Sequence, residues 1–110
     1  MKKVSRKTGA DRDLYERQAI LCKAFANPTR IHLLDLLGRG ELGASDLQER
    51  LGISKANLSQ HVSILRGAGV VNTRREGKRL LCVLSSPEIK EACNQIRAIL
   101  KKQGRNHRSS

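Results

Sequence analysis

Apolar residues recur every three or four positions along most of the chain, a spacing typical of amphipathic helices. The first such stretch covers residues 13–25. The pair Asn27-Pro28 then favours the start of a new helix, because Asn caps helices and Pro fits their first turn. The next stretch, residues 29–37, is apolar over most of its circumference, which predicts a central helix that ends before Gly38.

Two short helices joined by a glycine come next. Ser45 and Gln48 match a capping box, which predicts a helix over residues 45–51. After the glycine that follows, Ser54 caps a second helix that runs to Arg66. Two consecutive short helices with a glycine in their turn form the helix-turn-helix pattern.

The apolar period changes after Gly69 from the helical value to about 2, which predicts strands. Residues 70–75 and 78–84 indicate a hairpin with Glu76-Gly77 at its turn, and Ser86-Pro87 starts a final amphipathic helix over residues 88–102. The expected fold class is therefore mainly α with a β-hairpin. It is a winged helix-turn-helix with the order α-α-α-α-β-β-α.

The first and last helices carry apolar stripes that a winged helix does not need for its own core. A chain of 110 residues has little core to cover them. We therefore expect a homodimer in which the first and last helices pair across a two-fold axis. The predicted domain covers residues 13–102, between basic flexible tails at 1–12 and 103–110.

The helix from Ser54 to Arg66 has two contrasting faces on a helical wheel. One face carries Leu58, Val62 and Leu65 and is expected to meet the core. The opposite face is small and polar, which suits the major groove, where amides bond adenine, hydroxyls bond several base edges and a methyl meets thymine. Lys55 lies in the first turn, beside the expected phosphates. The opposite face consists of Ala56, Asn57, Ser59, Gln60 and Ser63.

The formal net charge is +12, which favours a polyanionic partner, most often nucleic acid. Eight of these charges lie near the two ends of the chain, in residues 1–12 and 101–110. A further cluster lies at the hairpin tip, where a wing would contact the DNA backbone. The cluster consists of Arg74, Arg75, Lys78 and Arg79. The alternative is a basic architectural or RNA-binding protein that binds by charge alone. No apolar run is long enough to span a bilayer, so no membrane role is expected.

Several segments resemble the ArsR/SmtB family of winged-helix repressors. The run from Lys23 to Ile31, KAFANPTRI, is similar to that family's signature, and residues 54–62 and 65–71 look like its DNA-reading helix and following turn. The resemblance implies a homodimeric bacterial repressor that binds an inverted repeat and is released by a ligand, often a metal or metalloid. It also implies that the first and last helices form the dimer. By position, the DNA contacts would be Ala56, Ser59 and Gln60, with Lys55, Asn57 and His61 nearby.

The sensor sites that the resemblance implies lack their ligands in this chain. Gly43 and Ser45 replace the two thiolate ligands of one site, and Ser86, Glu88, Ile99 and Lys102 occupy the positions of the zinc or nickel site. Asp35 and Lys101 occupy those of the dithiol switch. The inducer, any metal and any cofactor therefore stay unknown.

Three cysteines without a secretion signal indicate a reduced, cytoplasmic chain. Cys22 and Cys93 lie on the two expected dimer helices, so a thiol sensor that binds a metalloid or responds to oxidation is one hypothesis. Burial as small apolar residues is the other, and it is favoured. No nucleophile–base pair or carboxylate pair suggests an enzyme. Ser59 and His61 do not face each other on a helix.

Overall fold

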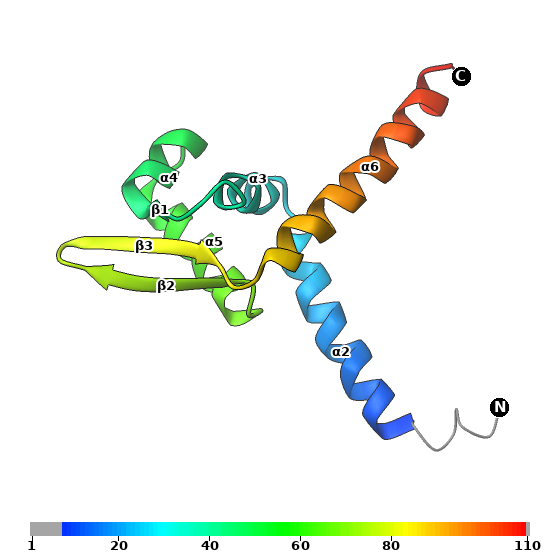
Figure 1. Ribbon diagram of the computed structural model, residues 1–110, viewed down its shortest axis with the longest axis horizontal. Helices are drawn as coiled ribbons and strands as arrows, with labels where there is room; N and C mark the ends of the chain where they lie inside the picture. Colours follow the sequence, from blue (N-terminus) through cyan, green and yellow to red (C-terminus); the bar gives the residue numbers. More distant parts are fainter. Residues whose placement is uncertain (1–7, 110) are drawn as a thin grey trace.

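The computed structural model describes residues 8–109 of the chain. Helices and strands follow one another in the order expected of a winged helix-turn-helix (Figure 1). The elements are α2 (Thr8–Phe25), α3 (Pro28–Leu37), β1 (Leu42–Gly43), α4 (Ala44–Leu51), α5 (Lys55–Gly67), β2 (Val71–Glu76), β3 (Arg79–Leu84) and α6 (Pro87–Ser109). The predicted fold class is confirmed, with one short strand added.

Two of the three predicted helix caps are present. The Asn27 side chain accepts a hydrogen bond of 3.0 Å from the Arg30 backbone N–H, and Pro28 opens α3. The prediction of a capping box at Ser45 was wrong. Helix α4 begins one residue earlier, and its N-cap, Gly43, makes no side-chain hydrogen bond. Gly43 is held in extended backbone by strand pairing with Leu81, so the sheet sets the start of this helix.

Strand β1 was missed because two residues are too short to show a period. It pairs with β3, which makes a three-stranded antiparallel sheet in the order β1-β3-β2. In this sheet Cys82 of β3 lies between Leu42 and Thr73. The hairpin turn lies at residues 77–78, one position later than predicted, and Gly77 supplies a positive φ of 65° there.

One apolar core lies between the helices and the inner face of the sheet. Helix α3 is central, as predicted, and contacts α2, α4, α5, α6 and β3. The residues with 0% exposure come from α3, α4, α5, β2 and β3, so each of these elements is anchored in the same core. They are Leu33, Leu47, Leu65, Val71 and Cys82.

The outer helices extend beyond their predicted ends. Helix α2 begins at Thr8 and α6 runs to Ser109, so residues 8–12 and 103–109, which were predicted as tails, are helical. The added segments are polar but contain no proline, and Asp11 favours the positive end of α2. The rest of the predicted tails, residues 1–7 and 110, lies outside the described residues.

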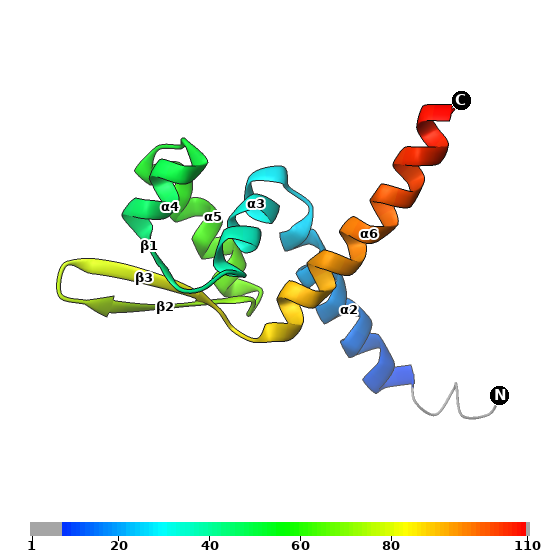
Figure 2. The ribbon, with the colours of Figure 1, turned by 45° about the horizontal axis from the view of Figure 1, so that its top comes forward.

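Helices α2 and α6 project from the same side of the molecule and diverge, as both ribbon views show (Figures 1 and 2). The Cα radius of gyration is 17.0 Å. A compact domain of this length would have a radius of about 13 Å. The chain is therefore extended by two helices that pack on the rest of the molecule only near the C-terminal end of α2 and the N-terminal end of α6.

Candidate nucleic-acid interface

The turn between α4 and α5 sets the angle between the two helices of the helix-turn-helix. Gly52 ends α4 in the left-handed region, with φ of 66°, and its N–H donates to the Gln48 carbonyl at 2.9 Å. The Ile53 N–H donates to the same carbonyl at 3.3 Å. The Ser54 hydroxyl then accepts a hydrogen bond of 3.1 Å from the Asn57 N–H, which opens α5 as predicted.

Helix α5 presents the two faces that its sequence predicts. Leu58, Val62 and Leu65 are at most 5% exposed and pack into the core. On the other sides, small side chains with amide and hydroxyl groups are exposed and form no salt bridge among the described residues. The exposed residues from the predicted set are Lys55, Ala56, Asn57, Ser59, Gln60 and Ser63. This face has the shape and chemistry for base edges in a major groove.

His61 differs from its neighbours on α5, although it was predicted beside them as a DNA contact. It is half-buried, and its Nδ1 lies 3.3 Å from the Arg30 guanidinium, on the side of α5 that faces α2 and α3. Burial, with the charge of Arg30 as a second cause, lowers the pKa of His61 below its ordinary value. His61 therefore lies at the edge of the exposed polar face.

A cleft of about 730 Å³ separates α5 from the hairpin. Hydroxyl and amide groups line it together with four cationic side chains and no carboxylate. The cations are Lys55, Arg66, Arg74 and Arg75. A cleft with this lining fits a polyanion such as a phosphate backbone.

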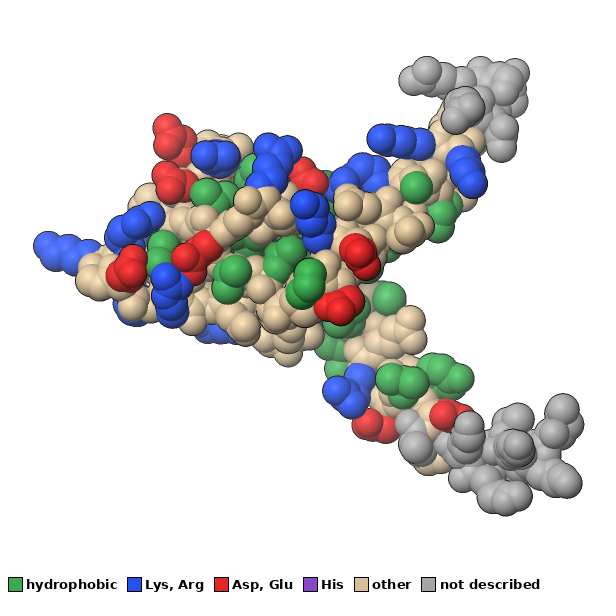
Figure 3. All heavy atoms as spheres, viewed as in Figure 1, with side chains coloured by type: hydrophobic (Ala, Val, Ile, Leu, Met, Phe, Trp, Pro, Cys, Tyr) green, Lys and Arg blue, Asp and Glu red, His purple; other side chains and the backbone are tan. Residues whose placement is uncertain are grey.

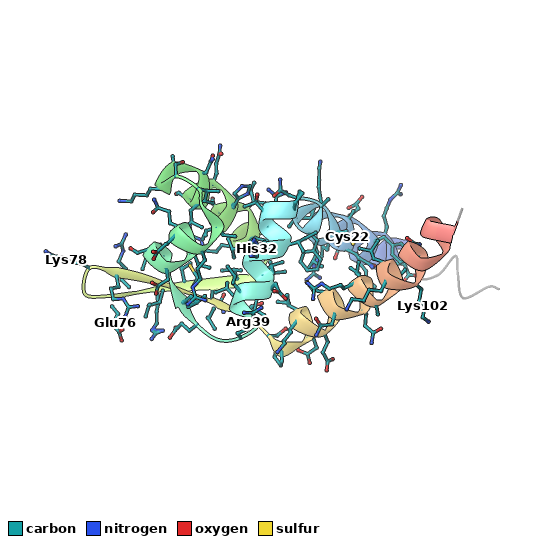
Figure 4. All side chains as sticks on the ribbon, turned by 90° about the horizontal axis from the view of Figure 1, so that it is seen from above. Cys22, His32, Arg39, Glu76, Lys78 and Lys102 are labelled. Carbon is teal, nitrogen blue, oxygen red and sulfur yellow. The ribbon has the colours of Figure 1, made fainter. Side chains whose placement is uncertain are left out.

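A second hollow of about 470 Å³ lies nearer the hairpin tip. Lys55, Arg75, Lys78 and Arg79 line it, with Asp46 as its one carboxylate. A Cβ at Gly43 would lie 3.0 Å from a terminal nitrogen of Arg79, so that glycine leaves room for the guanidinium. Lys78 lies at the far end of the hairpin (Figure 4). Three of the four predicted wing cations thus surround one hollow.

Arg74 and Arg75 lie on opposite faces of β2 because side chains alternate along a strand. Arg75 is on the face of Val71 and Thr73, toward the core and α5. Arg74 starts from the other face of the strand and, although it also borders the cleft, both of its terminal nitrogens bond the carboxylate of Glu41. Of the four predicted wing cations, Arg74 is therefore paired with carboxylates, whereas Arg75, Lys78 and Arg79 form no ion pair among the described residues.

Several polar residues of the cleft were not predicted from the sequence. Arg66 donates a hydrogen bond of 3.0 Å to the Thr73 hydroxyl, which ties α5 to the hairpin. The period of β2 could have placed Thr73 on the inner face with Arg75. Ser45 and Gln48 line the cleft from α4, and no signal in the sequence points to them alone.

The cysteines do not form a shared site in the described part of the chain. Cys22 is exposed, Cys82 is buried and Cys93 is half-buried, and all three are free. Burial raises the pKa of Cys93 and of Cys82, which disfavours their thiolates. No cluster of His, Cys, Asp or Glu able to hold a metal is present among residues 8–109. In the same range no helix is long and apolar enough to cross a membrane.

The projecting helices expose large apolar side chains, visible on both arms in Figure 3. Their exposed fractions are between 51% and 64%. On α2 they are Leu14, Tyr15 and Ile20, and on α6 they are Ile96, Ile99 and Leu100. A soluble chain rarely leaves such a surface uncovered, so this face is a candidate protein interface.

Comparisons with known proteins agree with this geometry. A family model described as a helix-turn-helix domain matches residues 25–74. The transcriptional activator HlyU of Vibrio cholerae is 42% identical over 74 residues, which cover 67% of this chain and 68% of that protein. The transcriptional repressor SdpR of Bacillus subtilis is 34% identical over 80 residues, or 73% of this chain and 89% of that protein.

A solved structure from Mycobacterium bovis superposes on this chain with a TM-score of 0.81 and 25% identity, and covers 88% of this chain and 90% of that one. It is described as a homodimeric winged helix-turn-helix DNA-binding domain of a possible ArsR-family transcriptional regulator. The chain belongs to the ArsR/SmtB family of winged-helix transcriptional regulators. As an ArsR/SmtB protein it is a DNA-binding regulator, and the prediction that it is not an enzyme is confirmed by this family.

Proposed function

We propose that the protein is a homodimeric repressor that binds an inverted-repeat operator in the cytoplasm. The observation that carries this proposal is the exposed, uncharged face of α5 beside a cleft lined by cations. Ala56, Ser59 and Gln60 would contact bases, while Lys55 and Asn57 lie near the phosphates. Arg75, Lys78 and Arg79 would follow the backbone from the wing.

The proposed dimer is supported by the apolar surfaces of α2 and α6. A second copy supplies the same surfaces through a two-fold axis, so each apolar stripe would cover another. Two-fold symmetry also supplies two copies of α5, as an inverted repeat requires when its half-sites lie about 34 Å apart, one helical turn of DNA. Repression is preferred to activation because SdpR and the biofilm growth-associated repressors among the relatives carry that description.

The charges on α6 are consistent with antiparallel packing of two α6 helices. Glu88 and Lys102 are fourteen residues apart, so helical geometry places them on the same flank of the apolar stripe, at opposite ends. In an antiparallel pair related by a two-fold axis, Glu88 of one copy would lie near Lys102 of the other. In a parallel pair the two-fold axis would place the two copies of each residue on opposite flanks, so Glu88 and Lys102 would not meet.

The test is a selection from a pool of random duplexes, followed by footprinting of the enriched sequence. We expect an inverted repeat, hereafter the selected duplex, bound at least about 10³-fold more tightly than a scrambled duplex of equal composition. The alternative, a basic architectural or RNA-binding protein, would enrich no sequence and would bind both duplexes equally at every salt concentration.

The thiol hypothesis at Cys22 and Cys93 stays a prediction. Its test is release of the reduced protein from the selected duplex by arsenite, soft metals, zinc, persulfide or peroxide. The assay is repeated with Cys22→Ser and Cys93→Ser. Release that survives both substitutions would exclude these thiols, and release lost in either would support them.

A further inference from the structure

Arg30 joins three helices through one guanidinium group. It lies in the first turn of α3, where its Nε donates to the Ala24 carbonyl at 2.7 Å and a terminal nitrogen donates to the Lys23 carbonyl at 3.4 Å. The other terminal nitrogen lies 3.3 Å from Nδ1 of His61, in the middle of α5. One side chain therefore connects the end of α2 and the start of α3 to the DNA-reading helix.

The contacts on α2 involve carbonyls at its C-terminal end. The last carbonyls of a helix have no partner within it, and a cation is favourable at this end of the helix dipole. Arg30 satisfies the Ala24 carbonyl and adds a second donor to the Lys23 carbonyl, which also accepts from the Ala26 N–H at 3.1 Å. The Arg30 guanidinium is thereby fixed relative to α2, which is one of the two helices assigned to the proposed dimer.

The contact on α5 requires a neutral histidine. A guanidinium can only donate hydrogen bonds, so Nδ1 of His61 must be the acceptor, and the ring proton is on Nε2. Protonation of His61 would remove the acceptor and place two positive charges together. The other side chains of the described residues do not compensate, because no carboxylate forms an ion pair with either group.

Among the described residues, this is the only side-chain hydrogen bond that joins α5 to α2 or α3. On its other side α5 is tied to the hairpin by Arg66 and Thr73. We propose that Arg30 is a positioning residue that sets the angle between the dimer helix α2 and the DNA-reading helix α5 through neutral His61. The proposal rests on the proposed dimeric function, and it assigns His61 to helix placement instead of phosphate binding.

In a two-fold dimer, this angle fixes the separation of the two α5 helices. Two half-sites one turn apart accept only a narrow range of separations. Binding to a scrambled duplex depends on the number of charges and tolerates other separations. Loss of the Arg30–His61 contact should therefore lower selectivity, defined as the ratio of the dissociation constants for the scrambled and selected duplexes.

The test compares three variants in the full chain at about pH 7.5. Arg30→Lys keeps the charge but loses the planar group whose three nitrogens reach separate acceptors, and His61→Leu removes the acceptor without changing the charge of neutral histidine. Both should lower selectivity about tenfold and leave scrambled-duplex binding within about twofold. His61→Asn is the matched control, because its Oδ1 can accept near the position of Nδ1. It should retain selectivity within about twofold.

A pH series separates placement from direct contact. Histidine gains its proton as the pH falls, and the lowered pKa of His61 means that the folded arrangement resists this change until more acidic conditions. Among the described residues, the charged group that bonds His61 is Arg30 of α3, and its charge adds to the effect of burial on the pKa of His61. As the pH falls below the ordinary histidine pKa of about 6.5, the wild-type selectivity should fall, while His61→Asn stays constant. If His61 contacted phosphate, protonation would strengthen binding to both duplexes.

Several outcomes would overturn the proposed role of Arg30 and His61 in helix placement, without affecting the proposed operator binding. One is wild-type selectivity in both Arg30→Lys and His61→Leu, and another is a pH response equal in wild type and His61→Asn. If Arg30→Lys loses its cooperative thermal transition, the comparison of His61→Leu with His61→Asn decides the question. A wild-type protein that did not distinguish the two duplexes would instead overturn the proposed operator binding itself.

Discussion

The body of the molecule, residues 28–84, buries its large apolar side chains, whereas the projecting helices α2 and α6 expose theirs. Among the described residues, twelve buried apolar residues lie within the body, against Ala24 of α2 and Ile89 of α6. Six of the eight large apolar residues that are exposed in this part of the chain lie on the two projecting helices. The body thus covers its apolar side chains within one core, whereas the apolar side chains of α2 and α6 would be covered only by another surface.

The difference separates two tasks in one short chain. The body carries the exposed face of α5, the wing and the cationic cleft, and all of them face outward from a packed core. In the proposed dimer, the projecting helices would supply surface for a second copy, which would position two bodies on one duplex. Arg30 connects the two regions, because it binds the end of α2 and His61 of α5.

The largest expected effect concerns the core of the body. Leu65 is fully buried, so Leu65→Ala should lower the free energy of unfolding by about 2–5 kcal/mol. Ile64, its neighbour on α5, is 45% exposed, and Ile64→Ala should cost less than about 1 kcal/mol. Urea unfolding of both variants measures the contrast. Equal losses would mean that the body is not packed as described.

The next effect concerns base reading by the outer face of α5. Gln60→Ala should weaken binding to the selected duplex by about 1–3 kcal/mol, because an amide that bonds a base edge is lost. Binding to the scrambled duplex should hardly change, since no charge is removed. Titration of both duplexes by fluorescence anisotropy checks this prediction. An equal loss on both would remove Gln60 from base recognition.

A smaller effect should distinguish the two arginines of the wing strand. Arg75→Ala should reduce the slope of log affinity against log salt by about one, as expected for the loss of a phosphate contact. Arg74→Ala should reduce it less, because Glu41 already neutralises Arg74. Affinities for the scrambled duplex over a range of salt concentrations give both slopes. A larger change of slope for Arg74→Ala than for Arg75→Ala would mean that Arg74, not Arg75, contacts the phosphates.

The smallest effect concerns the charges that flank the apolar stripe of α6. Glu88→Lys should weaken the dimer by less than about 1 kcal/mol, since exposed ion pairs contribute little. Combining it with Lys102→Glu should restore the wild-type value if the α6 helices are antiparallel. Sedimentation equilibrium measures each dimer constant. A double variant weaker than either single variant would argue against antiparallel packing.

Much of the fold could be predicted because its elements carry strong local signals. The caps at Asn27 and Ser54, the apolar circumference of α3 and the change of period before the hairpin all depend on neighbouring residues in the sequence. Strand β1 could not be predicted, because its two residues become a strand only through pairing with β3. The same pairing, not Ser45, sets the start of α4.

The candidate site was predicted less completely, for the same reason. A helical wheel places Ser59 and Gln60 on the outer face of α5, but it cannot show that His61 meets Arg30, thirty-one positions earlier in the chain. It also cannot show that Glu41 binds Arg74. Charge and period identify which residues are exposed, whereas the partners of those residues depend on tertiary contacts.

The central claim is that two copies, joined through α2 and α6, bind one operator. It is tested most directly by sedimentation equilibrium of Ile99→Asp, alone and on the selected duplex. Ile99 is 55% exposed on the apolar stripe, and Ala98→Asp places the same charge on the opposite face of α6 as a control.

The account predicts that Ile99→Asp is a folded monomer whose affinity for the selected duplex falls at least about a hundredfold, because the second half-site no longer binds as part of one dimer. Ala98→Asp should remain a dimer with the affinity of the wild type. An Ile99→Asp protein that stayed dimeric, or a wild-type protein that bound the selected duplex as a monomer, would contradict the claim.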